Sequence, residues 1–195
     1  MNANVQNNPQ AAPAGGGNKG LQPVEMPRLF QPLTVRSVTT RNRIMVAPMC
    51  QYSATDGVAD DWHLQHLGSR AAGGAGIVCT EVVHVEPRGR ITPNCLGLWN
   101  DEQRDALARI VRFMKSQGAA MAIQIGHAGR KGSTAQPWKG GKPLSAQDGG
   151  WRTIAPSPLP FADGYAVPVE MDLDTIAATL NLFAASTRRA REAGF

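Results

Sequence analysis

The chain has 195 residues, of which 42% are hydrophobic and 18% are charged, and its formal net charge at pH 7 is +5. This length and composition are typical of one globular domain with a single core. The apolar runs are much shorter than the ~18 residues that a membrane-spanning helix needs, so no membrane partner is expected. The basic residues are scattered and have no aromatic stripe beside them, which argues against a nucleic-acid partner.

The three cysteines are odd in number and lack the spacing of a disulfide framework or a zinc site; they are Cys50, Cys79 and Cys95. We therefore expect no metal and a reducing, cytoplasmic location. The chain also lacks a basic start followed by an apolar stretch, so we expect no secretory signal.

Residues 1–25 are rich in Asn, Gln, Pro, Ala and Gly and show no apolar periodicity. Such a segment cannot offset the entropy of ordering, and it is expected to be a disordered tail. Residues 26–195 then form the folded part. A short hairpin is expected at its beginning, from LFQPLTV (29–35) and TTRNRI (39–44).

Strand and helix patterns alternate after the hairpin. Buried-strand character is found at 43–49, 76–83 and 120–125, and helical spacing is found at 62–74, 101–117 and 171–195. This alternation predicts an α/β fold of right-handed βαβ units around a parallel sheet. A closed (β/α)8 TIM barrel takes about 250 residues, so we expect an N-terminal partial barrel of about three βα units.

Each predicted strand leads into polar side chains. Cys50 and Tyr52 follow the first strand, Glu81 lies near the end of the second, and the third leads into IQIGHAGRKG with Gln124 and His127. Reactive groups of parallel α/β folds gather beyond the carboxyl ends of the strands, so one site is expected there. Taken singly, a cysteine after a strand is more often a core residue, and the tyrosine, glutamine and histidine are more often structural. Glu81 is expected to be structural.

Five segments resemble, in order and spacing, the signature segments of the Old Yellow Enzyme family. They are LFQPLTV, RNRIMVAPMCQYSATDG, AAGGAGIVCTEVVHVEPRGRIT, LGLWND and IQIGHAGRKG. The resemblance runs from Leu29 to Phe195, and the cysteine after APM is similar to that of the bacterial, thermophilic-like ene-reductases. It implies a (β/α)8 barrel that binds FMN, is reduced by NADPH or NADH, and is reoxidised by a small-molecule activated alkene such as an enone. It also implies a homo-oligomer for the full-length enzyme.

The resemblance extends to the first strand end residue by residue. Ala47, Pro48, Met49 and Cys50 match the stretch that lines the flavin, with Cys50 beside the N5/O4 edge. A thiol is a weak hydrogen-bond donor there, able to tune the ring without acting as a general acid. Tyr52 matches a catalytic, substrate-facing phenol.

The later strands carry further matches to the family. Val82 occupies a position that is commonly alanine, where the backbone approaches the flavin, and Gln124 matches the amide that pairs with the pyrimidine edge. His127 and Arg130 are expected to support the site. The family's substrate-binding histidine pair, proton-donating tyrosine and phosphate-binding groups would lie beyond Phe195, so this chain is expected to be an inactive fragment by itself. The alternative is a non-catalytic, truncated half-barrel or pairing module without FMN.

Overall fold

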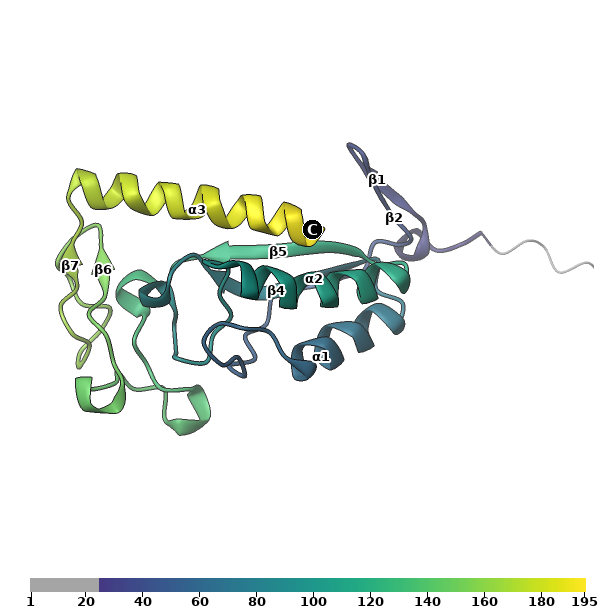
Figure 1. The fold of residues 1–195 in the computed structure, drawn as a ribbon. Coiled ribbons are helices and arrows are strands. Elements are labelled where there is room, and N and C mark those ends of the chain that lie inside the picture. Colours follow the sequence, from purple (N-terminus) through teal and green to yellow (C-terminus); the bar gives the residue numbers. More distant parts are fainter. Residues whose placement is uncertain (1–24) are drawn as a thin grey trace, which may run out of the picture.

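The central sheet is parallel, as the alternating pattern predicts. The computed structural model describes residues 25–195, so the predicted tail lies outside the described residues except for Glu25. Strands β3 (Met45–Val46), β4 (Ile77–His84) and β5 (Ala120–Gly126) lie in that order, and both pairs are parallel (Figure 1). The prediction of three adjacent parallel strands is confirmed.

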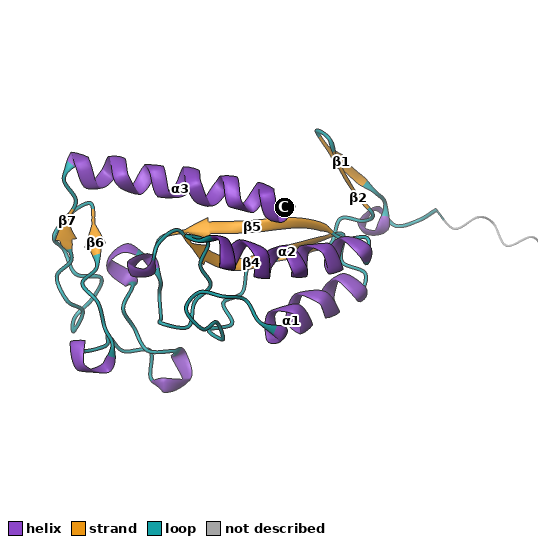
Figure 2. Ribbon diagram, viewed as in Figure 1, coloured by secondary structure: helices purple, strands orange, loops and turns teal. Residues whose placement is uncertain are grey.

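Three helices accompany the sheet, and all of them pack on one side of it. They are α1 (Asp61–Ala72), α2 (Asp101–Ser116) and α3 (Leu173–Ala193) (Figure 2). Polar caps determine where each helix begins: Asp60, Asn100 and Asp172 accept hydrogen bonds from backbone N–H groups of the first turns. Since no helix of the described part is long and apolar enough to span a membrane, the structure shows no transmembrane helix there.

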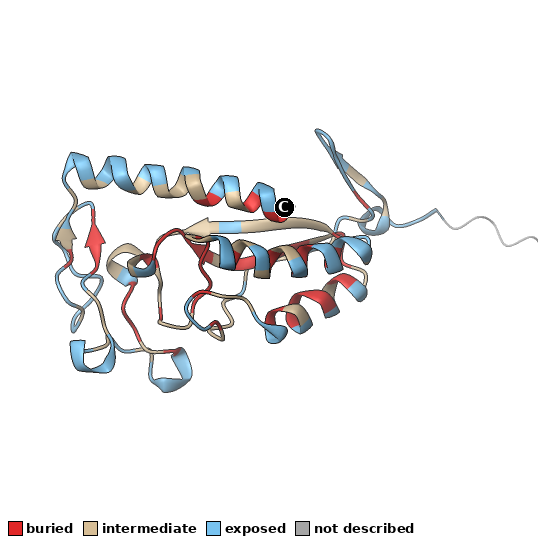
Figure 3. Cartoon of the chain, in the orientation of Figure 1, coloured by how far each residue is buried: buried red, intermediate tan, exposed pale blue. Residues whose placement is uncertain are grey.

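The core lies between the sheet and the helices. Leu107, Ile110 and Met114 of α2 are buried and pack in clusters with Val78 and Val83 of β4. No helix covers the opposite side of the sheet, and the residues of β5 there are intermediate or exposed (Figure 3). The strands therefore form an open portion of a barrel whose helices lie outside.

The N-terminal hairpin differs from the prediction. It consists of β1 (Leu33–Val35) and β2 (Val38–Thr40), so the second arm ends before most of residues 39–44. The reason is that Arg41 donates hydrogen bonds to the carbonyl oxygens of Ala71 and Gln117, at the carboxyl ends of α1 and α2. Carbonyl groups at helix ends attract cationic donors, so the chain from Arg41 onwards turns towards the helices and no longer pairs with the first arm of the hairpin.

The connection after β5 contains more structure than its polar sequence suggests. Strands β6 (Ile154–Ala155) and β7 (Val169–Glu170) form a short parallel pair that the hydrophobic pattern did not predict. The described part also contains short 3-10 turns at Arg28–Phe30, Pro87–Gly89, Gly129–Lys131, Pro137–Lys139 and Ala146–Asp148. This connection lies near the carboxyl ends of β4 and β5, opposite the hairpin (Figure 1).

The core predicts a contrast between two substitutions on α2. Leu107 is 1% exposed, so Leu107→Ala is expected to lower the free energy of unfolding by about 2–5 kcal/mol through lost burial and a residual cavity. The exposed Arg112 is the matched control, and Arg112→Ala is expected to change it by less than about 0.5 kcal/mol. Urea unfolding measures both, and equal effects would contradict this packing.

Candidate active site

A cavity of about 430 Å³ lies at the carboxyl ends of β4 and β5. This volume is within the range of small-molecule sites, about 300–1,000 Å³. Its lining residues come from the two strands, the segment after β3 and the loops after β4 and β5: Cys50, Val82, His84, Ile91, Gln124, Ile125, Gly126, His127, Ala128 and Lys131. The cavity thus lies where the pattern of polar strand ends predicts a site.

A β-bulge determines which residues of β4 face the cavity. The register with β5 shifts by one residue, because Cys79 pairs with Ala122 but Val82 pairs with Gln124. A bulge changes the side to which all later side chains of a strand point. After the shift, Val82 and His84 line the cavity, whereas Val83 is buried in the core.

Close packing on the cavity wall explains the glycine that ends β5. A Cβ atom at Gly126 would lie 2.6 Å from Cγ2 of Val82, closer than carbon atoms can approach. The valine at this position, where the resembling family commonly has alanine, therefore requires a residue without a side chain on the neighbouring strand.

Cys50 and Tyr52 supply protonated donors beside each other. Burial raises the pKa of the Cys50 thiol, and the nearby charge of Glu81 raises it further. Burial and the neighbouring Cys50 raise the pKa of Tyr52 to about 12. Tyr52 does not itself line the cavity. Its ring lies edge-on to that of Trp138, with 5.8 Å between the ring centroids, and its backbone has a φ of 51°.

Gln124 and His127 have different roles on the cavity wall. The Gln124 side chain is exposed at the cavity, where its amide can both donate and accept. His127 accepts a hydrogen bond from the Gly129 N–H at Nδ1 and donates one from Nε2 to Glu86, both at 2.9 Å. Because both ring nitrogens are engaged, His127 can orient the wall but offers no free nitrogen to a ligand.

The other sequence-predicted residues do not line the cavity. Ala47, Pro48 and Met49 lie just before Cys50 on the segment after β3. Arg130 donates to the Ser157 hydroxyl at 2.9 Å and borders a neighbouring hollow instead. The structure therefore brings together Cys50, Val82, Gln124 and His127, but not all of the expected set.

Sequence reasoning did not single out His84 and Ile91. The signal for His84 was available, since residues two apart on a strand share a face and Val82 was recognised. His84 is fully buried: Nδ1 donates to the Leu96 carbonyl at 2.9 Å, while Nε2 has no hydrogen-bond partner among the described residues. No comparable pattern marks Ile91, which reaches the cavity from a loop.

The known proteins that resemble this chain are oxidoreductases. Residues 28–195 match the family model of the NADH:flavin oxidoreductase / NADH oxidase family. An NADH:flavin oxidoreductase of Gibberella zeae is 41% identical over 191 residues, which are 96% of this chain and 46% of that protein. An NADPH dehydrogenase of a Geobacillus species is 40% identical over 169 residues, 86% of this chain and 45% of that protein. The chain spans about half the length of the curated relatives it matches.

Solved structures show the same fold. Morphinone reductase superposes with a TM-score of 0.71 at 27% identity, covering 86% of this chain and 46% of that one. The Old Yellow Enzyme homologue of Zymomonas mobilis superposes with a TM-score of 0.71 at 26% identity, covering 87% of this chain and 46% of that one. The fold is thus part of a TIM barrel, as predicted. The chain belongs to the NADH:flavin oxidoreductase / NADH oxidase family, whose solved relatives include the Old Yellow Enzymes.

The contact between Gly126 and Val82 predicts an energetic coupling. Gly126→Ala is expected to lower the free energy of unfolding by about 1–3 kcal/mol, because the added methyl group overpacks the wall. Adding Val82→Ala removes the clashing methyl group and is expected to restore most of this loss. Urea unfolding of the four proteins of this double-mutant cycle measures the coupling, and strictly additive effects would refute the contact.

Buried His84 predicts a dependence of stability on pH. Burial lowers the pKa of His84 to about 4, from 6.5 for an unperturbed histidine, so the folded chain resists protonation there. This contribution to stability is complete above pH 6.5 and is lost as the pH falls from 6.5 towards 4, by up to roughly 3 kcal/mol. His84→Gln, which keeps a donor for Leu96, should unfold with a shallower pH dependence in that window. Parallel pH profiles of the two proteins would contradict this assignment.

Proposed function

We propose that the chain forms the ring-facing wall of an FMN site in an oxidoreductase that passes hydride from NADPH or NADH to activated alkenes such as enones. The observation that carries the proposal is the meeting of Cys50, Val82 and Gln124 in one cavity at the carboxyl ends of parallel strands. The names of the relatives support it, since they include NADPH dehydrogenases, and one solved neighbour is morphinone reductase in complex with tetrahydroNAD.

The residues of the cavity fit a flavin ring. Val82, Ile91 and Ile125 provide apolar wall for a flat ring, and Gln124 provides both a donor and an acceptor for its polar edge. The Cys50 thiol adds a weak donor at a different part of the wall. When bound, FMN supplies the hydride-carrying chemistry of this class of enzyme, while the protein supplies binding and orientation.

The residues of the chain would act as donors and orienting groups. The raised pKa values keep the Cys50 thiol and the Tyr52 phenol protonated near neutral pH, so each can donate a hydrogen bond. We propose that Cys50 and the preceding Ala47, Pro48 and Met49 contact FMN, and that Tyr52 faces the substrate. His127, fixed by Glu86, would hold the wall in place, and Arg130 would support the loop through Ser157.

A second candidate is a half-barrel that pairs with another protein chain and binds no FMN. Exposed apolar side chains favour it: Met45 and Met49 are 53% and 42% exposed, and Leu173 and Leu180 of α3 are 83% and 64% exposed. Uncovered apolar surface of this kind is typical of interaction faces.

We also propose homo-oligomer formation and a cytoplasmic location, the latter because all three cysteines of the chain are free thiols.

FMN titration separates the two candidates. The open cavity has one cationic lining side chain, Lys131, for the phosphate, so we expect this chain to bind FMN weakly and to reduce no enone with NADPH by itself. Gln124→Leu should weaken FMN binding about tenfold, since it removes the amide from the ring edge. The control Gln117→Leu lies at the far end of α2 and should leave binding unchanged.

Flavin fluorescence quenching measures binding, and NADPH oxidation with cyclohexenone measures activity. Equal affinities of the Gln124 and Gln117 variants would overturn the assignment of this wall. Absence of FMN binding together with stable self-association in light scattering would favour the second candidate.

A further inference from the structure

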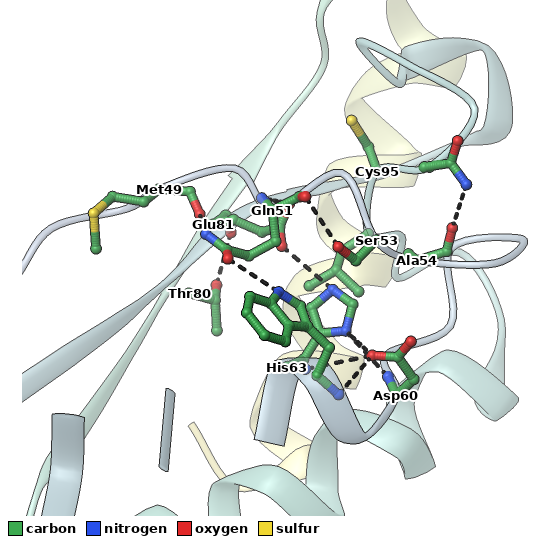
Figure 4. Close-up of polar contacts among 12 residues, drawn as sticks. Met49, Gln51, Ser53, Ala54, Asp60, His63, Thr80, Glu81 and Cys95 are labelled. Carbon is green, nitrogen blue, oxygen red and sulfur yellow. Dashed lines mark hydrogen bonds and ion pairs between the residues drawn. The ribbon is translucent and has the colours of Figure 1, made fainter. Parts of the chain in front are cut away.

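A buried group of ionisable side chains lies behind the cavity wall and has no part in the proposed chemistry. The side chains of His63 and Glu81 are 1% and 2% exposed, and His63 Nε2 lies 3.4 Å from Glu81 Oε1. On its other side, His63 Nδ1 lies 2.6 Å from Oδ1 of Asp60, the N-cap of α1 (Figure 4). His63 therefore lies between two carboxylates.

The charges of this group explain why a buried carboxylate is stable there. Burial opposes protonation of His63, but the carboxylates of Glu81 and Asp60 together raise the pKa of His63 above its ordinary value. His63 is the side chain that lies against Glu81 Oε1, and the removal of a partner from a buried carboxyl group is strongly destabilising. His63 thus holds Glu81 at a fixed place.

The second oxygen of Glu81 reaches the segment that carries the site residues. Glu81 Oε2 accepts a hydrogen bond from the backbone N–H of Gln51 at 3.2 Å. The Gln51 side chain is also fixed, because its Nε2 donates to the Met49 carbonyl at 2.8 Å and its Oε1 accepts from Trp62 Nε1 of α1 at 3.1 Å. The Ser53 hydroxyl also donates to the Gln51 carbonyl at 3.0 Å, so four hydrogen bonds hold the one residue between Cys50 and Tyr52 (Figure 4).

The conformation of this segment needs such support. Tyr52 has a φ of 51°, in the left-handed region that residues with a side chain rarely adopt. A strained residue persists only where its surroundings hold it, and such strain gathers at functional sites. The strain at Tyr52 and the neighbouring Cys50 thiol lie directly beside the peptide group that Glu81 binds.

The bulge of β4 explains how Glu81 can bind the Cys50–Tyr52 segment without lining the cavity. Because Thr80 and Glu81 are the residues between the shifted pairs, Glu81 is buried against His63 rather than lining the cavity. The Thr80 hydroxyl donates to the Glu81 carbonyl at 2.8 Å and fixes the bulge.

We infer that Glu81 is a positioning residue: held by His63, it fixes the Cys50–Tyr52 segment through the Gln51 N–H and so sets the shape of the cavity wall. This inference rests on the proposed function for its importance to flavin chemistry. The positioning itself can be measured without flavin.

The test compares two variants of similar volume in the 195-residue chain. Glu81→Leu removes the acceptor for the Gln51 N–H, whereas Glu81→Gln retains one, and both remove the charge. Ser186→Ala is the control, because it deletes a fully buried hydrogen bond from the Ser186 hydroxyl of α3 to the Leu98 carbonyl, and neither residue lines the cavity. The test has two readouts, both located by peptide mass spectrometry. They are the rate of hydrogen exchange of the Gln51 amide and the rate of Cys50 alkylation by iodoacetamide.

We expect Gln51 exchange and Cys50 alkylation to be about tenfold faster in Glu81→Leu than in Glu81→Gln, with Ser186→Ala equal to wild type. The loss of charge affects the thiol in both Glu81 variants, so their difference reports position alone. Equal rates in the two Glu81 variants, or an equal increase in Ser186→Ala, would overturn the inference. If Glu81→Leu does not fold, Glu81→Met, which also lacks the charge and the oxygen acceptor, replaces it with the same two outcomes.

A flavin readout separates this inference from the proposed function. Where FMN binds, its absorption band should shift in Glu81→Leu and keep the wild-type position in Glu81→Gln; an unshifted band in both would overturn the inference. If none of the proteins, wild type included, binds FMN, the proposed function fails, and the exchange and alkylation rates still decide the role of Glu81.

Discussion

The extra residue in β4 is the constraint on which the site depends. Without it, the alternation of the strand would place Val83 towards the cavity and bury Val82 and His84 among the core residues. With it, Val82 meets Gly126 across the sheet, and Glu81 turns to His63 behind the wall. A single local irregularity thus separates the residues that can touch a ligand from those that can only hold the wall. The sheet pairing on both sides of the bulge remains regular and parallel, so the arrangement requires no change elsewhere in the fold.

Near the cavity wall, Cys50 and Tyr52 are neutral hydrogen-bond donors. Burial and the Glu81 charge keep the Cys50 thiol protonated, and burial does the same for the Tyr52 phenol. A protonated thiol is a poor nucleophile, so covalent catalysis through Cys50 is disfavoured and hydrogen bonding to an electron-rich ring edge is favoured. The segment that carries these groups is held by hydrogen bonds of Gln51, one of which is accepted by the buried Glu81. This arrangement is typical of a cofactor enzyme, in which the protein contributes orientation and polarity and the cofactor contributes reactivity.

The hydrophobic periods predicted the strands and helices because each of them has one strongly buried side, as α2 has with Leu107, Ile110 and Met114. The hairpin arm was predicted too late because Thr40 is followed at once by Arg41, whose hydrogen-bond partners lie at the ends of two distant helices. The position of the bulge could not be predicted, since it depends on how β4 pairs with β5 and not on the residues of β4 alone. For the same reason the partners of Glu81, which are His63 and Gln51, could not be named from the sequence. The resemblance predicted Cys50, Val82 and Gln124, which the structure brings together at one cavity, whereas Arg130 borders a neighbouring hollow, where it donates to Ser157.

Arg41 also links parts of the molecule that the sheet does not join directly. Its guanidinium contacts carbonyl groups at the carboxyl ends of both α1 and α2, from a position immediately after the hairpin. The last turns of the two helices therefore share a single counter-charge, and neither can fray without weakening the hold on the other. Opening of this end of the molecule is consequently a concerted event that involves the hairpin, α1 and α2 together, while the cavity lies at the opposite end of the strands.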